Sequence, residues 1–219
     1  HWAGVCTLAE AGVDAVGDLL PPMPFLKAVL EVLKHKDARL RKRCLKKLNV
    51  RIESLAPRLP GSAVRALLAA LRDTAAVPGG AHRADGVGVP EASGLAQTAL
   101  LSIDLLAKEA ASREPSAFIA AAPALLEVAT SARAAGLVRT GPGGDARAAL
   151  ASSAILTMTT LVTSLGERLV PLVPQLLPAL CEELEAYASS RDMPGAVGPG
   201  AVQAPGGELV PLSCASSLE

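Results

Sequence analysis

Apolar residues recur at helical spacing through most of this sequence. In seven stretches they return every three or four positions, which places them on one face of an α-helix. No convincing alternation of apolar and polar residues, the pattern of a half-buried strand, stands between these stretches. The predicted helices cover residues 19–34, 38–55, 62–75, 91–112, 115–134, 145–166 and 168–189. A chain with this pattern buries its apolar faces by packing helix on helix, and we therefore expect an all-α fold.

The composition agrees with helix packing. Half of the residues are apolar but only 2% are aromatic, so alanine, leucine and valine make up most of the apolar mass. This mixture suits closely packed helices better than a sheet built on aromatic and branched residues. With 219 residues the chain is long enough to bury a sizeable core.

Proline and glycine mark where the helices stop. Pro60 and Gly61 end one helix, and Ser62 is placed to cap the next. Two longer loops, residues 77–90 and 136–145, are rich in glycine. Both lie between the first and second helix of a predicted pair, so the helices are expected to form hairpins.

These breaks divide the chain into three parts. Residues 1–18 begin with His and not Met, and we expect them to be the edge of a longer chain. Residues 19–189 hold the predicted helical hairpins. Residues 190–219 are rich in glycine and proline and have too few apolar groups to offset the entropy of ordering, so we expect a disordered tail.

One short element recurs along the helical part. Proline followed two positions later by leucine occurs at Pro24, Pro123 and Pro178, which we place within a turn or two of the start of a helix. The helices that follow begin about 53 residues apart, longer than the roughly 40–47 residues of common two-helix repeats. The glycine-rich loops account for the excess. We expect an α-solenoid of about seven helices, which is a short stack of hairpins.

The strongest charge feature lies at the second predicted helix. Residues 34–48 hold eight Lys or Arg and a single acid, Asp37. Residues 27–58 carry a net charge of +8, which the rest of the chain balances with −8, so the molecule is expected to be electrically two-sided. The apolar residues of this helix share one arc of a helical wheel: Leu40, Cys44, Leu45, Leu48, Ile52 and Leu55.

Most cations of this helix face away from the apolar arc. The candidate contact residues for RNA phosphates or an acidic protein are Arg39, Lys42, Arg43, Lys46 and Lys47. So many charges in four turns would make binding strongly salt-dependent, but no aromatic residue is interleaved for base stacking. Two other interpretations stay open, namely a solvated outer face and a nuclear or nucleolar import signal.

Arg41 differs because it falls inside the apolar arc. A cation there needs a partner, and Asp37, one turn earlier, can supply it. The pattern Asp37-x-x-Leu40-Arg41-x-x-Cys44 resembles the signature of HEAT repeats. The resemblance implies an armadillo-like helical fold in which Asp37 and Arg41 form part of a hydrogen-bonded ladder between stacked repeats. The other predicted repeats lack the full signature.

A further resemblance covers most of residues 20–187. The runs PFLKAVLEVLKHKDARLRKRCLKKLNVRIESL, LAQTALLSIDLLAKEAA and LVPLVPQLLPALCEELEAY are similar to the very large HEAT-repeat proteins of the small-subunit processome. That family is associated with the small nucleolar ribonucleoprotein that processes pre-ribosomal RNA. The resemblance implies a nucleolar or nuclear scaffold without catalysis, which binds proteins of a large ribonucleoprotein assembly. The charge of residues 34–58 adds a candidate contact with RNA phosphates.

Two other functions remain open. The chain could be another HEAT-type adaptor, in a transport, phosphatase or cytoskeletal assembly, with a cytoplasmic location. It could also be a regulatory segment of a larger enzyme whose catalytic site lies elsewhere.

No catalytic, metal or cofactor site is predicted. The four cysteines have no short spacing, which argues against a zinc site. Gly86-x-Gly88 follows a loop and not a strand, and GPGGD at 141–145 lacks the Lys-Ser/Thr of a phosphate loop. Residues 148–166 are uncharged but hold seven hydroxyl side chains, so a buried helix is expected and no membrane span. No small-molecule substrate is expected.

Overall fold

The computed structural model describes residues 19–76, 89–137, 142–178, 181–182, 185, 201–203 and 209–211. The chain divides into two compact units, His1–Leu176 and Leu177–Glu219. The described part of the first unit consists of helices and the turns between them. The predicted edge segment, residues 1–18, lies outside the described residues, as do residues 77–88 and 138–141 of the two glycine-rich loops. The other residues of those predicted loops, 89–90, 136–137 and 142–145, are helical, so both loops were predicted too long.

The helices of the first unit follow the predicted order closely. They are α2 (Pro22–Leu33), α3 (Ala38–Leu55), the 3-10 helix η1 (Ala56–Arg58), α4 (Gly61–Ala75), α5 (Val89–Ala110), α6 (Pro115–Leu137), α7 (Pro142–Leu165) and the 3-10 helix η2 (Gly166–Leu172).

Two local predictions at helix starts were wrong. Ser62 does not cap α4, because the helix already begins at Gly61, and its N-cap residue Pro60 offers no side-chain acceptor. Pro123 does not lie near a helix start, because α6 begins eight residues earlier. Its side chain is exposed, so the missing backbone N–H lies on the solvent side of the helix, where a distortion is better tolerated.

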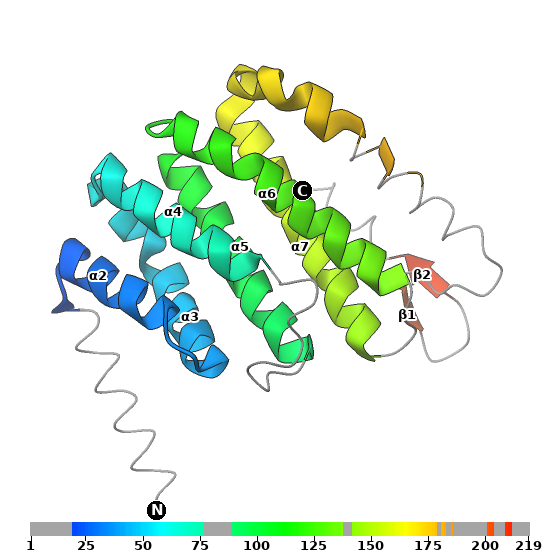
Figure 1. The fold of residues 1–219 in the computed structure, drawn as a ribbon, viewed down its shortest axis with the longest axis horizontal. Helices are drawn as coiled ribbons and strands as arrows, with labels where there is room; N and C mark the ends of the chain where they lie inside the picture. Colours follow the sequence, from blue (N-terminus) through cyan, green and yellow to red (C-terminus); the bar gives the residue numbers. More distant parts are fainter. Residues whose placement is uncertain are drawn as a thin grey trace, which may run out of the picture. The chain divides into compact units, whose positions relative to one another are not determined.

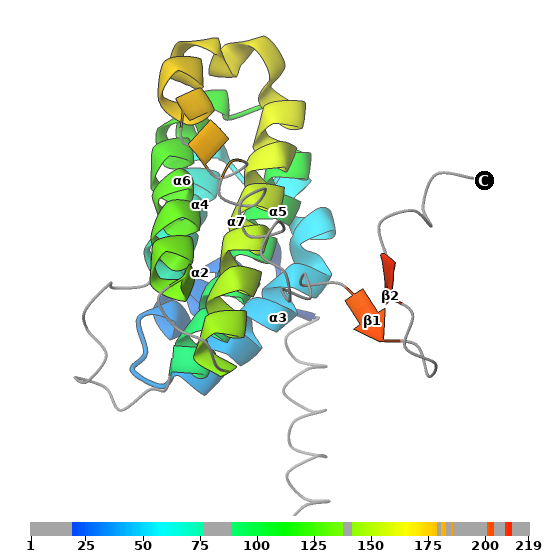
Figure 2. The same ribbon diagram turned by 90° about the vertical axis from the view of Figure 1, so that its right-hand side faces the viewer.

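The helices form two layers of side-by-side helices (Figures 1 and 2). One layer consists of α2, α4 and α6, and the other of α3, α5 and α7, with neighbours in contact within each layer. Each helix of the first layer also contacts its successor in the second, so the chain forms three hairpins, α2–α3, α4–α5 and α6–α7. Because each hairpin buries its apolar face against the next, the architecture is an α-solenoid, as predicted.

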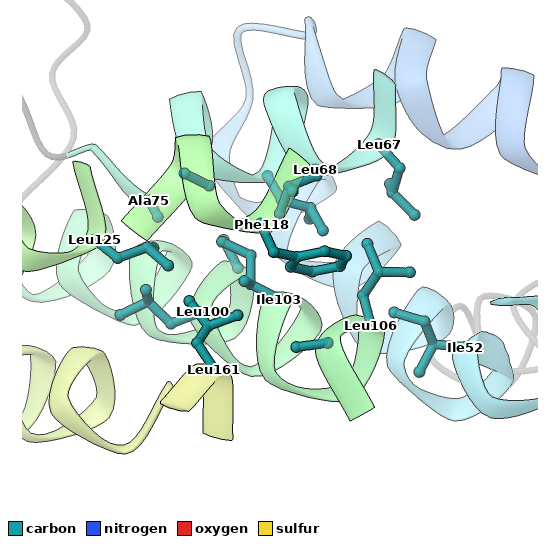
Figure 3. Close-up of a cluster of buried hydrophobic side chains, with 14 of the residues drawn as sticks. Ile52, Leu67, Leu68, Ala75, Leu100, Ile103, Leu106, Phe118, Leu125 and Leu161 are labelled. Carbon is teal, nitrogen blue, oxygen red and sulfur yellow. The ribbon is translucent and has the colours of Figure 1, made fainter. Parts of the chain in front are cut away.

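The core lies between the two layers and runs through all three hairpins. Figure 3 shows the ring of Phe118, from α6, among the side chains of Leu68, Ile103 and Leu106 from α4 and α5. The largest fully buried side chains are Leu45, Leu48, Ile52, Leu67, Leu71, Leu100, Ile103, Leu106, Phe118, Leu125, Leu150 and Leu161. Every α-helix from α3 to α7 contributes to this set, so no hairpin in that range has a separate core.

The segment Ala149–Pro178 is long and apolar enough, by length and composition alone, to cross a membrane. It is not one straight helix. Its first part, α7, ends at Leu165, and Gly166 with φ of 53° leads into η2. The predicted helix beginning at 168 is therefore 3-10 over its first turns and becomes α-helical at 173. Since α7 packs against α5 and α6, the structure favours a helix packed within the stack over a membrane span.

The second unit contains one short antiparallel ribbon among its described residues. Strand β1 (Ala201–Gln203) pairs with β2 (Leu209–Pro211), with Val202 opposite Val210. The other residues of the predicted disordered tail, 190–219, lie outside the described part of the chain, so that prediction stays untested.

Candidate nucleic-acid and partner interface

The candidate interface is α3, whose start is fixed by Asp37. The Oδ1 atom of Asp37 accepts hydrogen bonds from the backbone N–H groups of Arg39 at 2.8 Å and Leu40 at 3.4 Å. A carboxylate at this position satisfies two helix N–H groups and complements the positive end of the helix dipole. The backbone N–H of Asp37 in turn donates to Nδ1 of the exposed His35, at 3.1 Å. The local sequence therefore specifies where the basic helix begins.

The buried face of α3 matches most of the predicted apolar arc. Leu45, Leu48, Ile52 and Leu55 are buried in the core, and Cys44 is half-buried. Leu40 is the exception, since 41% of it is exposed. The predicted apolar arc is therefore confirmed from Cys44 to Leu55 and wrong at Leu40, in the first turn of the helix.

The candidate contact residues differ in how accessible they are. Arg39, Arg43 and Lys46 are exposed, whereas Lys42 and Lys47 are half-buried. All five lie on α3, at the edge of the layer that it forms with α5 and α7. The structure therefore brings the predicted cations together on one helix, with three of them open to solvent along its N-terminal half.

Neighbouring α5 engages part of this basic surface. Arg39 donates to Glu91 at 2.8 Å, and this hydrogen bond raises the pKa of the Arg39 guanidinium above its ordinary value. The amine of Lys42 lies beside Gly94, where an added Cβ would stand only 2.6 Å from Nζ. Arg39 and Lys42 thus hold the N-terminal half of α3 in register with α5.

The middle of α3 is tied to α5 by a buried polar contact. Ser102 is fully buried, and its hydroxyl donates to Oδ1 of Asn49 at 2.5 Å. Like the contacts of Arg39 and Lys42, this contact joins residues 52 or 53 positions apart in the sequence. The repeat length predicted from the sequence therefore appears directly as the register between two adjacent layer helices.

The predicted pairing of Asp37 with Arg41 was wrong. The Asp37 carboxylate caps α3, and no hydrogen bond or ion pair joins it to Arg41 among the described residues. Arg41 instead lines a hollow of about 850 Å³ between α2 and α4, together with Glu31 and Asp73. Its Nε atom is buried there without a hydrogen-bond partner in the described part of the chain. Capping and pairing compete for the same carboxylate, and capping places it at the helix end.

A second set of arginines joins the hairpins, and sequence reasoning missed it. An arginine stands three residues after the end of each helix of the α3, α5 and α7 layer; we call these the turn arginines, Arg58, Arg113 and Arg168. Arg113 donates to the backbone carbonyls of Ala56, Leu59 at 3.4 Å and Pro57 at 3.5 Å, in the turn after α3. Arg168 donates to the carbonyl of Ser112, 3.3 Å away, in the turn after α5.

Each of these two bonding patterns ties a turn to the turn of the preceding hairpin. Helix ends leave carbonyls without intrahelical donors, and an arginine fork is well suited to bind several of them. The turn arginines are spaced 55 residues apart, and this regular spacing is the sequence signal that could have revealed them.

Replacing Arg113 with alanine is expected to lower the free energy of unfolding by about 1.5–3 kcal/mol, because a charged donor to several carbonyls is lost. Thermal unfolding followed by circular dichroism measures the change. Arg58→Ala is the matched control: Arg58 is exposed and is expected to cost less than about 0.5 kcal/mol in this chain. Equal losses in the two variants would mean that the carbonyl contacts do not stabilise the stack.

Cys44 provides a chemical test of how α3 is packed. Burial raises the pKa of the Cys44 thiol to about 11, whereas Cys181 is exposed. At pH 8 only about a thousandth of Cys44 would be thiolate, against about a quarter of an ordinary cysteine. Alkylation at pH 8, read by peptide mass spectrometry, should label Cys181 at least tenfold faster. Comparable rates would contradict the packing of α3.

The raised pKa of Cys44 also makes the stability of the fold depend on pH. The folded pKa of Cys44 lies above its unfolded value, so burial of the neutral thiol contributes fully below about pH 8.5. That contribution is lost as the pH rises towards about 11.

Another exposed feature of the same layer is a groove between α5 and α7. It has a volume of about 580 Å³ and is lined by the half-exposed Leu101, by Leu156, which is 67% exposed, and by hydroxyl side chains that include Thr98 and Thr160. Its mixture of apolar and hydroxyl groups suits a polypeptide better than a phosphate backbone. Among the described residues, no group of three or more His, Cys, Asp or Glu side chains is placed to hold a metal ion.

Comparison with known proteins gives one similarity. The chain is 23% identical over 208 residues to the HEAT repeat-containing protein 1 homolog of Dictyostelium discoideum, and the match covers 94% of this chain but 8% of that protein. No family model matches the chain, and no solved structure matches it. The similarity, together with two layers of stacked hairpins, supports a helical-repeat scaffold or adaptor of the HEAT type.

Proposed function

We propose that this chain is a non-catalytic scaffold segment in ribosome biogenesis, acting in assembly of the small-subunit processome and in processing of pre-ribosomal RNA. The observation that carries the proposal is the similarity to a HEAT repeat-containing protein along 94% of the chain. A match of that extent runs through all three hairpins and does not depend on one leucine-rich helix. The resemblance of the three sequence runs to processome HEAT-repeat proteins supplies the more specific part of the proposal.

Contact with RNA would occur along α3. Its exposed cations, Arg39, Arg43 and Lys46, lie on a rigid helix, and Lys42 and Lys47 flank them. Such a surface binds phosphates without regard to base identity, because α3 holds no aromatic side chain on which a base could stack. RNA binding of this kind would position a transcript on the scaffold and would not select its sequence.

Contact with proteins would use the remaining surface of the α3, α5 and α7 layer. Stacked hairpins expose an extended surface to long partners, and the groove between α5 and α7 is a hollow part of it. A segment with these partners would reside in the nucleolus or nucleus.

A second candidate function is that of a HEAT-type adaptor in a transport, phosphatase or cytoskeletal assembly in the cytoplasm. The exposed leucines of the groove, Leu101 and Leu156, favour a protein partner without requiring RNA. A regulatory segment of a larger enzyme is the remaining alternative, and no observation in the described residues favours it over the first two.

Affinity purification of the tagged protein from its own cells separates these functions, provided that proteins and RNA are identified in the same eluate. Recovery of processome proteins together with pre-ribosomal RNA is the expected result. Recovery of transport, phosphatase or cytoskeletal proteins without that RNA would overturn the proposal and leave the helical-repeat fold unaffected.

A further inference from the structure

We infer that Arg58 is a docking residue for a further helical hairpin, which would pack against the α2–α3 edge of the stack and offer the backbone carbonyls of its closing turn to the guanidinium. The inference concerns how the solenoid is extended. It does not depend on the proposed function in ribosome biogenesis.

The first argument is the equivalence of the three turn arginines. Arg58, Arg113 and Arg168 each stand three residues after the last residue of a helix in the same layer. Arg113 and Arg168 both donate to carbonyls of the preceding turn, and the acceptors Pro57 and Ser112 each lie two residues after a layer helix. Two successive hairpins therefore use the same residue type, at the same position, for the same contact.

The second argument is the state of Arg58 itself. Its side chain is exposed at the end of η1, and it makes no hydrogen bond or ion pair with any described residue. Arg113, at the equivalent position, binds three carbonyls. The difference between them is that a hairpin precedes the one that ends in Arg113, whereas no described hairpin precedes α2–α3 (Figure 1).

The third argument is the apolar character of this edge. Leu40 lies two residues before Lys42, about 160° round the helix, and Lys42 faces Gly94 of α5. Leu40 therefore points away from α5, towards the open edge, and is 41% exposed. An edge with an exposed leucine and with an arginine that has no partner among the described residues matches what a hairpin buries in the interior of the stack.

The chemistry of the contact favours a hairpin over an anion. Where the turn arginines have partners, these partners are neutral backbone carbonyls at helix ends, which lack intrahelical donors. RNA could also contact an exposed arginine through a phosphate, but it would leave Leu40 unburied. RNA contact is therefore an outcome that the test must distinguish.

Photo-cross-linking in the native assembly tests the inference. A photoreactive amino acid replaces Arg58, and in a separate variant it replaces Arg43 on the outer face of α3. We expect position 58 to cross-link to a peptide that maps within about four residues of the end of a helix, in the closing turn of a helical hairpin, and position 43 not to do so. A cross-link from position 58 to RNA or to a non-helical segment, or no cross-link at all, would overturn the inference.

Hydrogen exchange gives a second, independent readout. Arg58→Ala should raise exchange rates in the last turn of α3 by about tenfold in the native assembly and leave them unchanged in the 219-residue chain made alone. Arg113→Ala should raise exchange around the same turn in both settings, since its acceptors belong to this chain. Equal effects of Arg58→Ala in the two settings would contradict a hairpin docked at Arg58.

Discussion

Replacing Phe118 with alanine is expected to lower the free energy of unfolding by about 3–5 kcal/mol, because the change removes a large buried side chain and leaves a cavity. Phe118 is fully buried, and its ring lies among side chains of α4 and α5 (Figure 3). It is the only aromatic residue in the fully buried set of the described core. The labelled side chains around it are leucines and isoleucines, which are smaller, and a core relaxes only partly around such a cavity.

The effect should extend beyond α6. In a solenoid, stability is the sum of the hairpins and of the interfaces between them, and Phe118 lies at the interface between the second and third hairpins. Its loss should therefore loosen α6–α7 more than α2–α3. Hydrogen exchange resolved by segment would show this gradient, and uniform loosening of all helices would argue that the stack unfolds as one unit.

Thermal denaturation measures the total loss, which corresponds to a fall in Tm of roughly 6–20 °C for a domain of this size. Ser116→Ala is the matched control, since Ser116 lies in the first turn of the same helix and is exposed. A Phe118→Ala variant as stable as this control would mean that the ring is not part of the core.

Local sequence chemistry explains why the helix boundaries could be predicted. Asp37 caps α3 through its own backbone neighbours, and Pro115 starts α6 at the predicted residue. Such signals act over three or four residues and are readable without the fold. The repeat spacing was also readable, because each hairpin recurs with a similar length and the contact between Asn49 and Ser102 joins residues 53 apart.

The contacts that join hairpins could not be read in the same way. Arg41 sits within the apolar arc, and the sequence suggested Asp37 as its partner, but the carboxylate was already used in capping. Arg113 and Arg168 gave no local signal, since their acceptors are backbone carbonyls that carry no residue identity. Only their spacing distinguishes them from ordinary surface arginines. Contacts between a side chain and the backbone of a distant turn are thus the part of the fold that residue types do not predict.

The sequence predicted the candidate interface in outline, but the neighbouring helix α5 changes which of its cations are accessible. A helical wheel treats α3 in isolation and places Lys42 with the outer cations, whereas α5 lies against that side and half-buries it. Arg39 remains exposed, but Glu91 of α5 neutralises part of its charge. The position of α5 beside α3 is a tertiary feature, so the sequence indicated which helix is basic without indicating which cations are most accessible.

Reversing the charge of Lys42, Arg43, Lys46 and Lys47 together, by substitution with glutamate, is expected to reduce affinity for single-stranded RNA by at least about 100-fold near 0.1 M salt. Each phosphate contact that is lost removes about 0.7 from the slope of log K against log salt concentration, so the slope should fall by up to about three. Filter binding or fluorescence anisotropy with an unstructured oligonucleotide, measured over a salt series, gives both quantities. The loss should be the same for oligonucleotides of different sequence, because no aromatic residue of α3 can stack on a base.

A pair of single variants identifies the face that binds. Lys46 and Lys27 are both exposed lysines, the first on α3 and the second on α2 in the opposite layer. Lys46→Glu should reduce the salt slope by about 0.7, and Lys27→Glu should leave it nearly unchanged. Circular dichroism must show that the fourfold variant keeps its helicity, since Lys42 packs beside Gly94. If folded protein with four reversed charges binds RNA with the parent affinity and slope, α3 is a solvated outer face, and any RNA contact lies elsewhere on the chain.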